Sequence, residues 1–325
     1  MLAYKVSILI PVYNSSKFIE RCAHSVFSQT FESVEYIFVD DCSTDDSMLI
    51  LNKVIDNYPA RKVAVRIITH DVNKGISAAR QTAFDKAVGD YFIAMDSDDY
   101  IEPTMVELLY KKATEANSDM VYCLFFSESK NKQLVNYPNF KNNKVHLLQQ
   151  AILGNSAYWN KLILRRILVE NKISALNGID HGDDLIVLAK IIYFSTNFAY
   201  LPIPLYHYVE YNVNSTTKKF KPKYIEDRLK LVEDLDKFFS SIVDYQLYQS
   251  SIILLKAIRK AVIIRLTNAD EKYIGLYPEI NSHVFELKLK PVDKLILYLA
   301  KRKQIILLKI LLMLSNFKTK LMSYF

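Results

Sequence analysis

Residues 6–41 read VSILIPVYNSSKFIERCAHSVFSQTFESVEYIFVDD, and this stretch decides the fold. Two mostly apolar runs, Val6–Ile10 and Val34–Val39, are typical of strands buried in a parallel sheet. Between them Ile19, Cys22, Ala23, Val26 and Phe27 recur at steps of three and four, as on one face of a helix. The order strand, helix, strand predicts two strands joined by a crossover helix.

The same alternation continues along the chain. It predicts helices over 47–58, 76–87 and 105–116, and strands over 63–69, 91–95 and 120–126. Together these elements indicate an α/β fold with a doubly wound sheet flanked by helices. Ligands of such sheets bind beyond the carboxyl ends of the strands, so we expect the loops after Ile10, Val39, Thr69 and Met95 to share one crevice.

Two later regions differ from this pattern. The stretch Ser127–Asn143 is rich in Asn and Lys, and we expect a mobile loop there. Beyond Pro222 the alternation stops, and apolar periodicity predicts long helices over 224–241, 245–267 and 292–314. We therefore place a boundary near Lys218, with a catalytic domain over 1–218 and a helical carboxyl-terminal region over 219–325.

Composition favours a globular protein, with half of the 325 residues hydrophobic and only six Gly. The three cysteines lack metal-ligand spacing and are interpreted as reduced cytosolic thiols. No stretch approaches the roughly 18 consecutive apolar residues of a membrane-spanning helix. Lys5 before a short apolar run that Pro11 interrupts is unlike a signal peptide. We expect a cytoplasmic protein, soluble or peripheral at the inner face of the cell membrane.

The net charge of +7 is unevenly distributed, because Asp293 is the only acidic residue between Lys288 and Lys320. The basic residues of this segment alternate with Leu and Ile at helical spacing. That arrangement suits a membrane interface better than nucleic acid, which we do not expect as a partner. The alternative is an ordinary helix packed on the catalytic domain or on a second subunit of a homo-oligomer.

The strongest chemical signal is Met95-Asp96-Ser97-Asp98-Asp99, at the end of a predicted strand. In an extended backbone Asp96 and Asp98 point the same way and can present two carboxylates to one cation. Hard oxygen ligands suit Mg²⁺ or Mn²⁺, which can stabilise a leaving diphosphate. The alternative is that Asp98 or Asp99 caps the helix predicted to follow.

A second acidic pair, Asp40 and Asp41, ends an earlier strand of the same predicted sheet. These carboxylates can accept hydrogen bonds from a uracil imide or from ribose hydroxyls. The alternative is again local, because Ser43 or Thr44 can open the helix that begins near Ser47.

Four motifs in order carry a family resemblance: residues 6–14 (VSILIPVYN), 39–45 (VDDCSTD), 73–80 (NKGISAAR) and 96–99 (DSDD). With them the chain resembles the family 2 glycosyltransferases of GT-A fold over about residues 4–216. The resemblance implies inverting transfer of a hexose or N-acetylhexosamine from a nucleotide-diphosphate sugar, most often a UDP-sugar. The acceptor would be a glycan or a lipid-linked molecule in polysaccharide biosynthesis.

The resemblance also implies roles for individual residues. Asp41 would contact uracil, Asp96 the ribose or donor sugar, and Asp98, with Asp96, the metal. The remaining positions expected to line the nucleotide-sugar site are Pro11, Tyr13, Asn14, Asp40, Lys74, Gly75, Arg80 and Ser97. Lys74 and Arg80 have an alternative interpretation as solvated charges at a helix end.

An inverting transfer needs a carboxylate that removes the proton of the acceptor hydroxyl. The segment Gly178–Leu185 lies where the family carries Glu-Asp before an apolar helix, which makes Asp184 the expected base. Asp183 stands where Glu is usual, so the choice between Asp183 and Asp184 stays open. The alternative is that the pair caps the helix 185–194.

Three further positions follow from the same resemblance. Trp159 and Asn160 match a segment beneath the acceptor site, although Trp159 suits a buried core equally well. His207 falls where some relatives place a late metal ligand, with a packed histidine as the alternative. Residues 215–218 are expected to form a loop that closes over the diphosphate.

Other functions are weighed on sequence grounds. A sugar nucleotidyltransferase needs a Gly-rich basic loop after the first strand, but Pro11–Phe18 contains no Gly. The missing GxGxxG argues against a dinucleotide dehydrogenase. A non-catalytic nucleotide-sugar-binding module stays an alternative, and it would keep Asp41 and Asp98 without needing Asp184.

Overall fold

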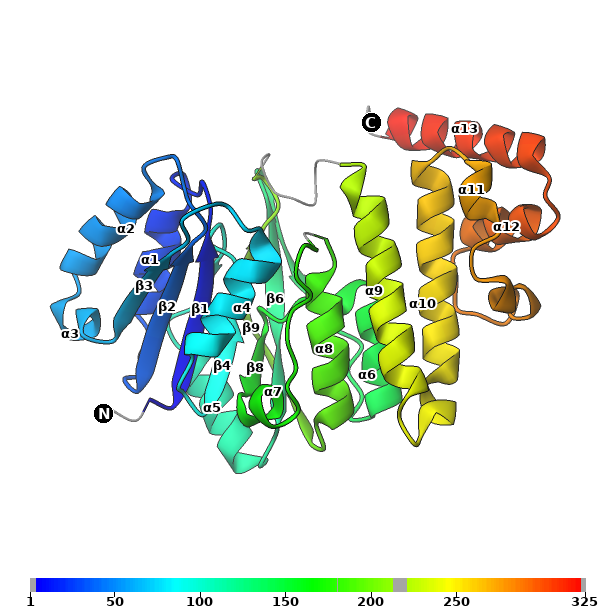
Figure 1. The fold of residues 1–325 in the computed structure, drawn as a ribbon. Coiled ribbons are helices and arrows are strands. Elements are labelled where there is room, and N and C mark those ends of the chain that lie inside the picture. Colours follow the sequence, from blue (N-terminus) through cyan, green and yellow to red (C-terminus); the bar gives the residue numbers. More distant parts are fainter. Residues whose placement is uncertain (1–3, 180, 213–220, 323–325) are drawn as a thin grey trace. The chain divides into compact units, whose positions relative to one another are not determined.

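The structure is a computed structural model that describes residues 4–179, 181–212 and 221–322 (Figure 1). The chain divides into two compact units, Met1–Lys221 and Pro222–Phe325. The first unit contains a sheet with helices, and the second is helical in its described part.

In the described part of the first unit, nine strands form one mixed sheet in the order β3-β2-β1-β4-β8-β6-β9-β5, with β7 paired to β6. The first four strands of this order are parallel, β8 is antiparallel to both of its neighbours, and β6 is parallel to β9. The strands are β1 (Val6–Val12), β2 (Val34–Asp40), β3 (Val65–Thr69), β4 (Tyr91–Ala94), β5 (Tyr100–Ile101), β6 (Met120–Ser129), β7 (Lys132–Asn136), β8 (Lys161–Leu164) and β9 (Phe198–Val209).

The helices of this unit connect and cover the sheet (Figure 1). Helix α4 packs on β1 and β2, and α5 packs on β6, β8 and β9. The helices are α1 (Ile19–Phe27), α2 (Ser47–Asp56), α3 (Pro59–Lys62), α4 (Ile76–Lys86), α5 (Met105–Glu115), α6 (Lys144–Gln150), α7 (Arg166–Glu170) and α8 (Asp183–Phe194), with a π-turn at Ala151–Asn155.

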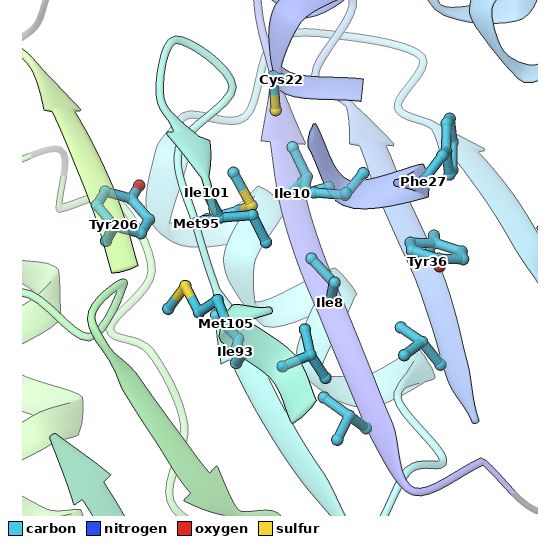
Figure 2. Close-up of a cluster of buried hydrophobic side chains, with 14 of the residues drawn as sticks. Ile8, Ile10, Cys22, Phe27, Tyr36, Ile93, Met95, Ile101, Met105 and Tyr206 are labelled. Carbon is cyan, nitrogen blue, oxygen red and sulfur yellow. The ribbon is translucent and has the colours of Figure 1, made fainter. Parts of the chain in front are cut away.

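The predicted strand-helix-strand unit is confirmed as β1-α1-β2. Every residue of β1 and β2 is buried, and the five apolar positions predicted for one helix face are the buried residues of α1. Figure 2 shows Ile8 and Ile10 of β1 in a buried cluster with Cys22 and Phe27 of α1 and with Met95. This core fixes the carboxyl ends of β1 and β4, from which the polar loops emerge.

The expectation of a loop over Ser127–Asn143 is wrong for most of that stretch. Strand β6 continues to Ser129, and β7 returns beside it with Phe126 opposite Val135 and Glu128 opposite Gln133. The composition misled the prediction because polar side chains on an exposed hairpin do not prevent backbone hydrogen bonding between the strands.

Strands β8 and β9 lie outside the sequence prediction, although they complete the sheet. Strand β8 has only four residues, and β9 is interrupted in its apolar pattern by Pro202 and Pro204. The pairing of β6 with β9 shifts register between Cys123 and Phe125, which accommodates Pro204. Pairing with distant strands, and not local periodicity, determines these two elements.

The second unit consists of α9 (Lys223–Ser240), α10 (Tyr245–Leu266), α11 (Glu271–Ile274), a 3₁₀ turn at Pro278–Ser282, α12 (Pro291–Lys301) and α13 (Ile305–Met322). The single helix expected over 292–314 is therefore wrong, because the chain turns between α12 and α13, where Lys303 has a φ of 55°. No helix among the described residues is long and apolar enough to cross a bilayer.

Candidate active site

The loops after β1 and β2 are tied to each other by hydrogen bonds. Asn14 has a left-handed φ of 49°, and its Oδ1 accepts from the Thr44 backbone N–H at 2.8 Å. Its own backbone N–H donates to Ser43 Oγ at 3.2 Å. Tyr13 is 49% exposed beside this junction, whereas Pro11 is buried inside β1. The two loops therefore form one surface at the carboxyl edge of the sheet, as predicted for the crevice.

Asp41 organises the third loop of the crevice. Its carboxylate is 3% exposed and accepts the backbone N–H groups of Lys74 at 2.9 Å and Gly75 at 2.8 Å. Gly75 has a φ of 88°, a conformation that residues with a Cβ rarely adopt. The adjacent Asp40 accepts from the Ser43 backbone N–H at 2.9 Å. Both acids therefore hold the loops in place, and Asp41 is buried where the loops after β2 and β3 meet.

Sequence reasoning missed His70, which follows the end of β3. Its Nδ1 lies 2.7 Å from Asp41 Oδ1, and its Nε2 lies 2.9 Å from Thr82 Oγ1. The imidazole is 6% exposed and thus fixes the Asp41 carboxylate from the side of α4. The sequence position of His70 could have identified it, because it follows a parallel strand directly and ligands bind at that edge of such a sheet.

The acidic segment after β4 does not cap a helix. The N-cap of α5 is Thr104, and Asp99 instead accepts from Tyr206 O–H at 2.6 Å and from the Val209 backbone N–H at 2.8 Å. These bonds anchor the segment to β9. Tyr206 is a further residue that sequence reasoning missed, since nothing marks a tyrosine within a strand as an acid's partner.

Asp98, like Asp96, is half-buried, whereas Asp99 is buried. Burial, together with the charge of Asp96, raises the pKa of Asp98 to about 6. Asn212 Nδ2 donates to its Oδ2 at 2.8 Å. The neighbouring Ser97 hydroxyl lies 2.6 Å from Ser15 Oγ, which joins this segment to the loop after β1. Asp96 and Asp98 therefore place two carboxylates close together in this segment.

Arg80 joins two parts of the site that are distant in sequence. One guanidinium nitrogen lies 2.7 Å from Asp96 Oδ1 and the other 2.7 Å from Asp183 Oδ2. The side chain is 13% exposed and lies over the Tyr158 ring. Burial by itself would lower the pKa of Arg80, but Asp183 and Asp96 raise it well above its usual value. The alternative of a solvated charge at a helix end does not hold for Arg80.

The two carboxylates at the start of α8 have different partners. Asp183 is 3% exposed, and Arg80 neutralises it. Asp184 Oδ2 accepts from Ser156 Oγ at 2.8 Å, while its Oδ1 bonds the Leu185 backbone N–H. Asp184 is half-buried, so it is more accessible than Asp183. Ser156 is the third partner residue that sequence reasoning missed.

His207, the third expected metal ligand, has protein partners at both ring nitrogens. Its Nε2 lies 2.8 Å from Glu102 Oε1 and its Nδ1 3.3 Å from Glu128 Oε1, and the ring stacks on Tyr100 at 4.0 Å. Both ring nitrogens are thus already engaged by carboxylates. These contacts agree with the packed histidine given above as the alternative, and a role of His207 as a metal ligand stays a prediction.

The expected acceptor residues are mostly engaged within the protein. The indole of Trp159 stacks on Tyr206 at 4.5 Å and on Tyr208 at 5.4 Å. Asn160 is 4% exposed, and its Nδ2 donates to the Cys123 carbonyl at 2.8 Å. The segment therefore supports β9 and the acidic loop, and an acceptor contact by these two residues stays a prediction.

Few side chains are available as metal ligands in the described part of the site. Within the described ranges 4–179, 181–212 and 221–322, no three His, Cys, Asp or Glu side chains are grouped to hold a metal. Asp98 and Asp96 nevertheless fit a hard cation, because Mg²⁺ commonly binds one or two carboxylates together with substrate phosphates. The loop expected over 215–218 lies outside the described residues.

The fold defines the class of protein. The chain superposes on Staphylococcus aureus TarS 1–349 in complex with UDP-GlcNAc with a TM-score of 0.75, covering 96% of this chain and 91% of that one at 17% identity. It also resembles a mannosyltransferase from Pyrobaculum calidifontis in complex with GDP-Man and Mn²⁺, with a TM-score of 0.54, 16% identity and coverage of 97% and 87%. The first unit is thus a GT-A glycosyltransferase fold.

Sequence similarity identifies the family. The glycosyl transferase family 2 model matches residues 7–169, and the chain belongs to this family. A cholesterol galactosyltransferase of Borreliella burgdorferi is 31% identical over 224 residues, which are 60% of each protein. A chondroitin synthase of Escherichia coli is 46% identical over 103 residues, which are 32% of this chain and only 14% of the synthase.

Proposed function

We propose that this glycosyltransferase moves a hexose or N-acetylhexosamine, with inversion, from a UDP-sugar to a hydroxyl of a glycan or lipid-linked acceptor. The observation that carries the proposal is the Arg80 bridge, because it brings Asp96 of the DxD segment next to the Asp183-Asp184 pair. The similarity to TarS with bound UDP-GlcNAc supports the choice of donor. The similarity to a chondroitin synthase supports a role in polysaccharide synthesis.

The donor would lie over the loops after β1, β2 and β4. Tyr13 and Asn14 offer an exposed surface for the base, with Asp41 and Asp40 beneath it. The ribose, the sugar and the diphosphate would then face Asp96, Ser97, Lys74, Gly75 and Arg80. Arg80 presents a fork of N–H donors, the geometry that suits phosphate oxygens.

Asp98 and Asp96 would hold a Mg²⁺ or Mn²⁺ ion. When bound, such an ion neutralises the charge that develops on the leaving diphosphate.

Asp184 is the proposed base, and this proposal decides the choice that the sequence left open. Asp183 is 3% exposed and its Oδ2 is already bound by Arg80, so an acceptor hydroxyl has little access to this carboxylate. Asp184 is held by a single hydroxyl and a backbone N–H, so lone pairs remain for the acceptor hydroxyl. It would remove the proton as the hydroxyl attacks the face opposite the diphosphate.

We also propose that α13 lies on an anionic membrane surface at the cytoplasmic face. Leu308 and Leu312 are buried in the core of the second unit, whereas five apolar side chains are exposed. These exposed residues are Ile306, Leu307, Ile310, Met313 and Leu314. At about 100° per residue they form one stripe opposite the buried face, with Lys309 at its edge.

Thermal unfolding across a panel of nucleotide sugars tests the donor and the metal together. We expect stabilisation by one UDP-sugar with Mn²⁺ and none with a chelator present, because the diphosphate and the metal bind as one unit. Hydrolysis of the same donor should require the metal as well. Equal stabilisation by every nucleotide with chelator present would contradict the proposal.

Asp184→Asn tests the base. Turnover should fall by about a hundredfold or more, because general base catalysis is worth that much, while donor binding stays unchanged. The rate of sugar transfer and the affinity for UDP are the two measurements. Unchanged turnover would instead favour a non-catalytic nucleotide-sugar-binding module or another base.

A further inference from the structure

A small cavity in the first unit is not used by the donor or by the proposed base. Its volume is about 60 Å³. Four aromatic residues line it together with polar side chains that include Asn160 and Lys161; the aromatic residues are Tyr122, Phe125, Phe140 and Trp159. Asn139 and Gly154 are also part of the lining and are exposed, so the cavity reaches the surface.

Lys161 is an unusual residue for such a wall. It is 3% exposed, and its Nζ lies 4.8 Å from the centre of the Tyr122 ring. The ammonium donates to the Ala157 carbonyl and to Asn160 Oδ1, the latter at 2.8 Å, which leaves one of its three N–H donors unused. None of the ion pairs found among the described residues includes Lys161, and burial lowers its pKa to about 7.

The cavity adjoins the proposed base. Leu188, which also lines it, lies one turn beyond Asp184 on α8. Gly154 and Ala157 lie on either side of Ser156, whose hydroxyl binds Asp184. The charge of Asp184 acts on Lys161. A group in this cavity would therefore lie close to Asp184.

We propose that this cavity is an acceptor subsite for an anionic group, a carboxylate or a phosphate, bound by Lys161 Nζ. The inference rests on the proposed function, since it takes Asp184 as the base. A buried cation without a carboxylate partner is costly, and an anion would provide both the missing charge and a charge-assisted hydrogen bond. A space of about 60 Å³ admits a few atoms but not a sugar ring, so only the charged substituent enters.

The probes are D-glucuronate, inorganic phosphate and, as the neutral match to glucuronate, D-glucose. Their effect on thermal unfolding of the full chain is measured with UDP and Mn²⁺ present, so that phosphate cannot bind at the donor site. We expect at least one anion to raise the Tm and glucose to raise it less. A rise in Tm with glucuronate but not with phosphate would indicate an acceptor that carries a carboxylate. A rise with phosphate but not with glucuronate would indicate a phosphorylated acceptor.

Two variants identify the site. Lys161→Met should weaken anion binding by about tenfold or more, because hydrogen bonds between charged groups contribute that much. Lys53→Met, at an exposed position on α2, is the matched control and should change nothing. Ala157→Leu keeps the ammonium but fills the cavity, so it should also weaken binding, and it serves as the test if Lys161→Met does not fold.

Two results would overturn the inference. One is an anion response that persists in both Lys161→Met and Ala157→Leu. The other is glucose stabilising the wild type as much as glucuronate and phosphate do. Failure of the proposed function can be told apart, because the wild type would then not bind UDP with Mn²⁺. Lys161→Met should still bind UDP with Mn²⁺.

Discussion

Asp183 and Asp184 are chemically alike and adjacent, yet their partners give them different roles. Arg80 binds Asp183, and the hydroxyl of Ser156 binds Asp184. The Ser156 bond fixes the direction of the Asp184 carboxylate without cancelling its charge. Ser156 is therefore a positioning residue in the proposed reaction.

Ser156→Ala should lower kcat by about tenfold, because a hydrogen bond to a charged group is lost, while KM for the donor stays unchanged. Ser156→Thr should restore kcat, and Ser240→Ala is the matched control on α9. An unchanged kcat in Ser156→Ala would argue against this role.

Lys161 makes the free energy of unfolding depend on pH. Its folded pKa of about 7 lies below the ordinary value of 10.5, so between these values the unfolded state binds more protons. Stability therefore rises with pH in this window, by up to about 1.4 kcal/mol per pH unit. Urea unfolding near pH 7.5 and near pH 9.5 should show this rise in the wild type and a smaller one in Lys161→Met. Equal slopes would contradict the assignment.

Individual acids were easier to find from the sequence than their partners. Asp41, Asp96 and Asp98 stand in recognisable motifs at strand ends. His70 and Tyr206 stand in no motif, and Tyr206 reaches Asp99 from 107 positions away. A side chain's hydrogen-bond partner depends on tertiary contacts, which local patterns do not contain.

At the scale of elements, β1 approaches the turn before β4 so closely that this turn requires a glycine. A Cβ at Gly89 would lie 2.7 Å from Ser7 Oγ and 2.8 Å from the Ser7 backbone nitrogen. The Gly89 N–H also donates to Ser7 Oγ at 2.9 Å. The two strands can pair at this end only if position 89 has no side chain.

Gly89→Ala should reduce the free energy of unfolding by about 2 kcal/mol, because the crowded backbone has to move. Gly275→Ala is the matched control, since a Cβ there meets nothing within 4 Å and the φ of −79° suits alanine. We expect that control to be neutral or slightly stabilising. Denaturant unfolding of the two variants makes the comparison, and equal losses would refute the steric explanation.

Elements with strong periodicity were predicted well, and those defined by pairing were not. Helix α1 and strands β1 and β2 follow the sequence pattern closely. The hairpin of β6 and β7 was expected to be a loop, because its polar residues hide an extended backbone. The break between α12 and α13 was also missed, since apolar residues continue on both sides of it.

At the scale of the whole molecule, the exposed stripe of α13 predicts partition to anionic vesicles. Replacing Ile306, Ile310 and Met313 together by Gln should reduce vesicle binding by about tenfold or more, because their apolar area then stays in water. Donor hydrolysis in solution should not change. Co-sedimentation with and without anionic phospholipid, at low and high salt, measures the effect.

Val63→Gln is the control for this experiment, because Val63 is equally apolar and 77% exposed but lies in the first unit. If the triple variant binds vesicles as the wild type does, α13 is not the membrane-binding face. If the wild type binds neutral and anionic vesicles equally well, the apolar stripe accounts for binding and Lys309 does not contribute.

The sequence by itself determined the alternation of β1, α1, β2, α2, β3, α4, β4, α5 and β6, the edge of the sheet at which the polar loops meet, and the family resemblance. These follow from local periodicity and from motifs of a few adjacent residues. Tertiary structure alone decided which of the two carboxylates Arg80 binds, that His207 is hydrogen-bonded to glutamates, and that Lys161 lines a cavity. The physical reason is distance along the chain, because Arg80 and Asp183 are 103 positions apart and only folding brings their charges together.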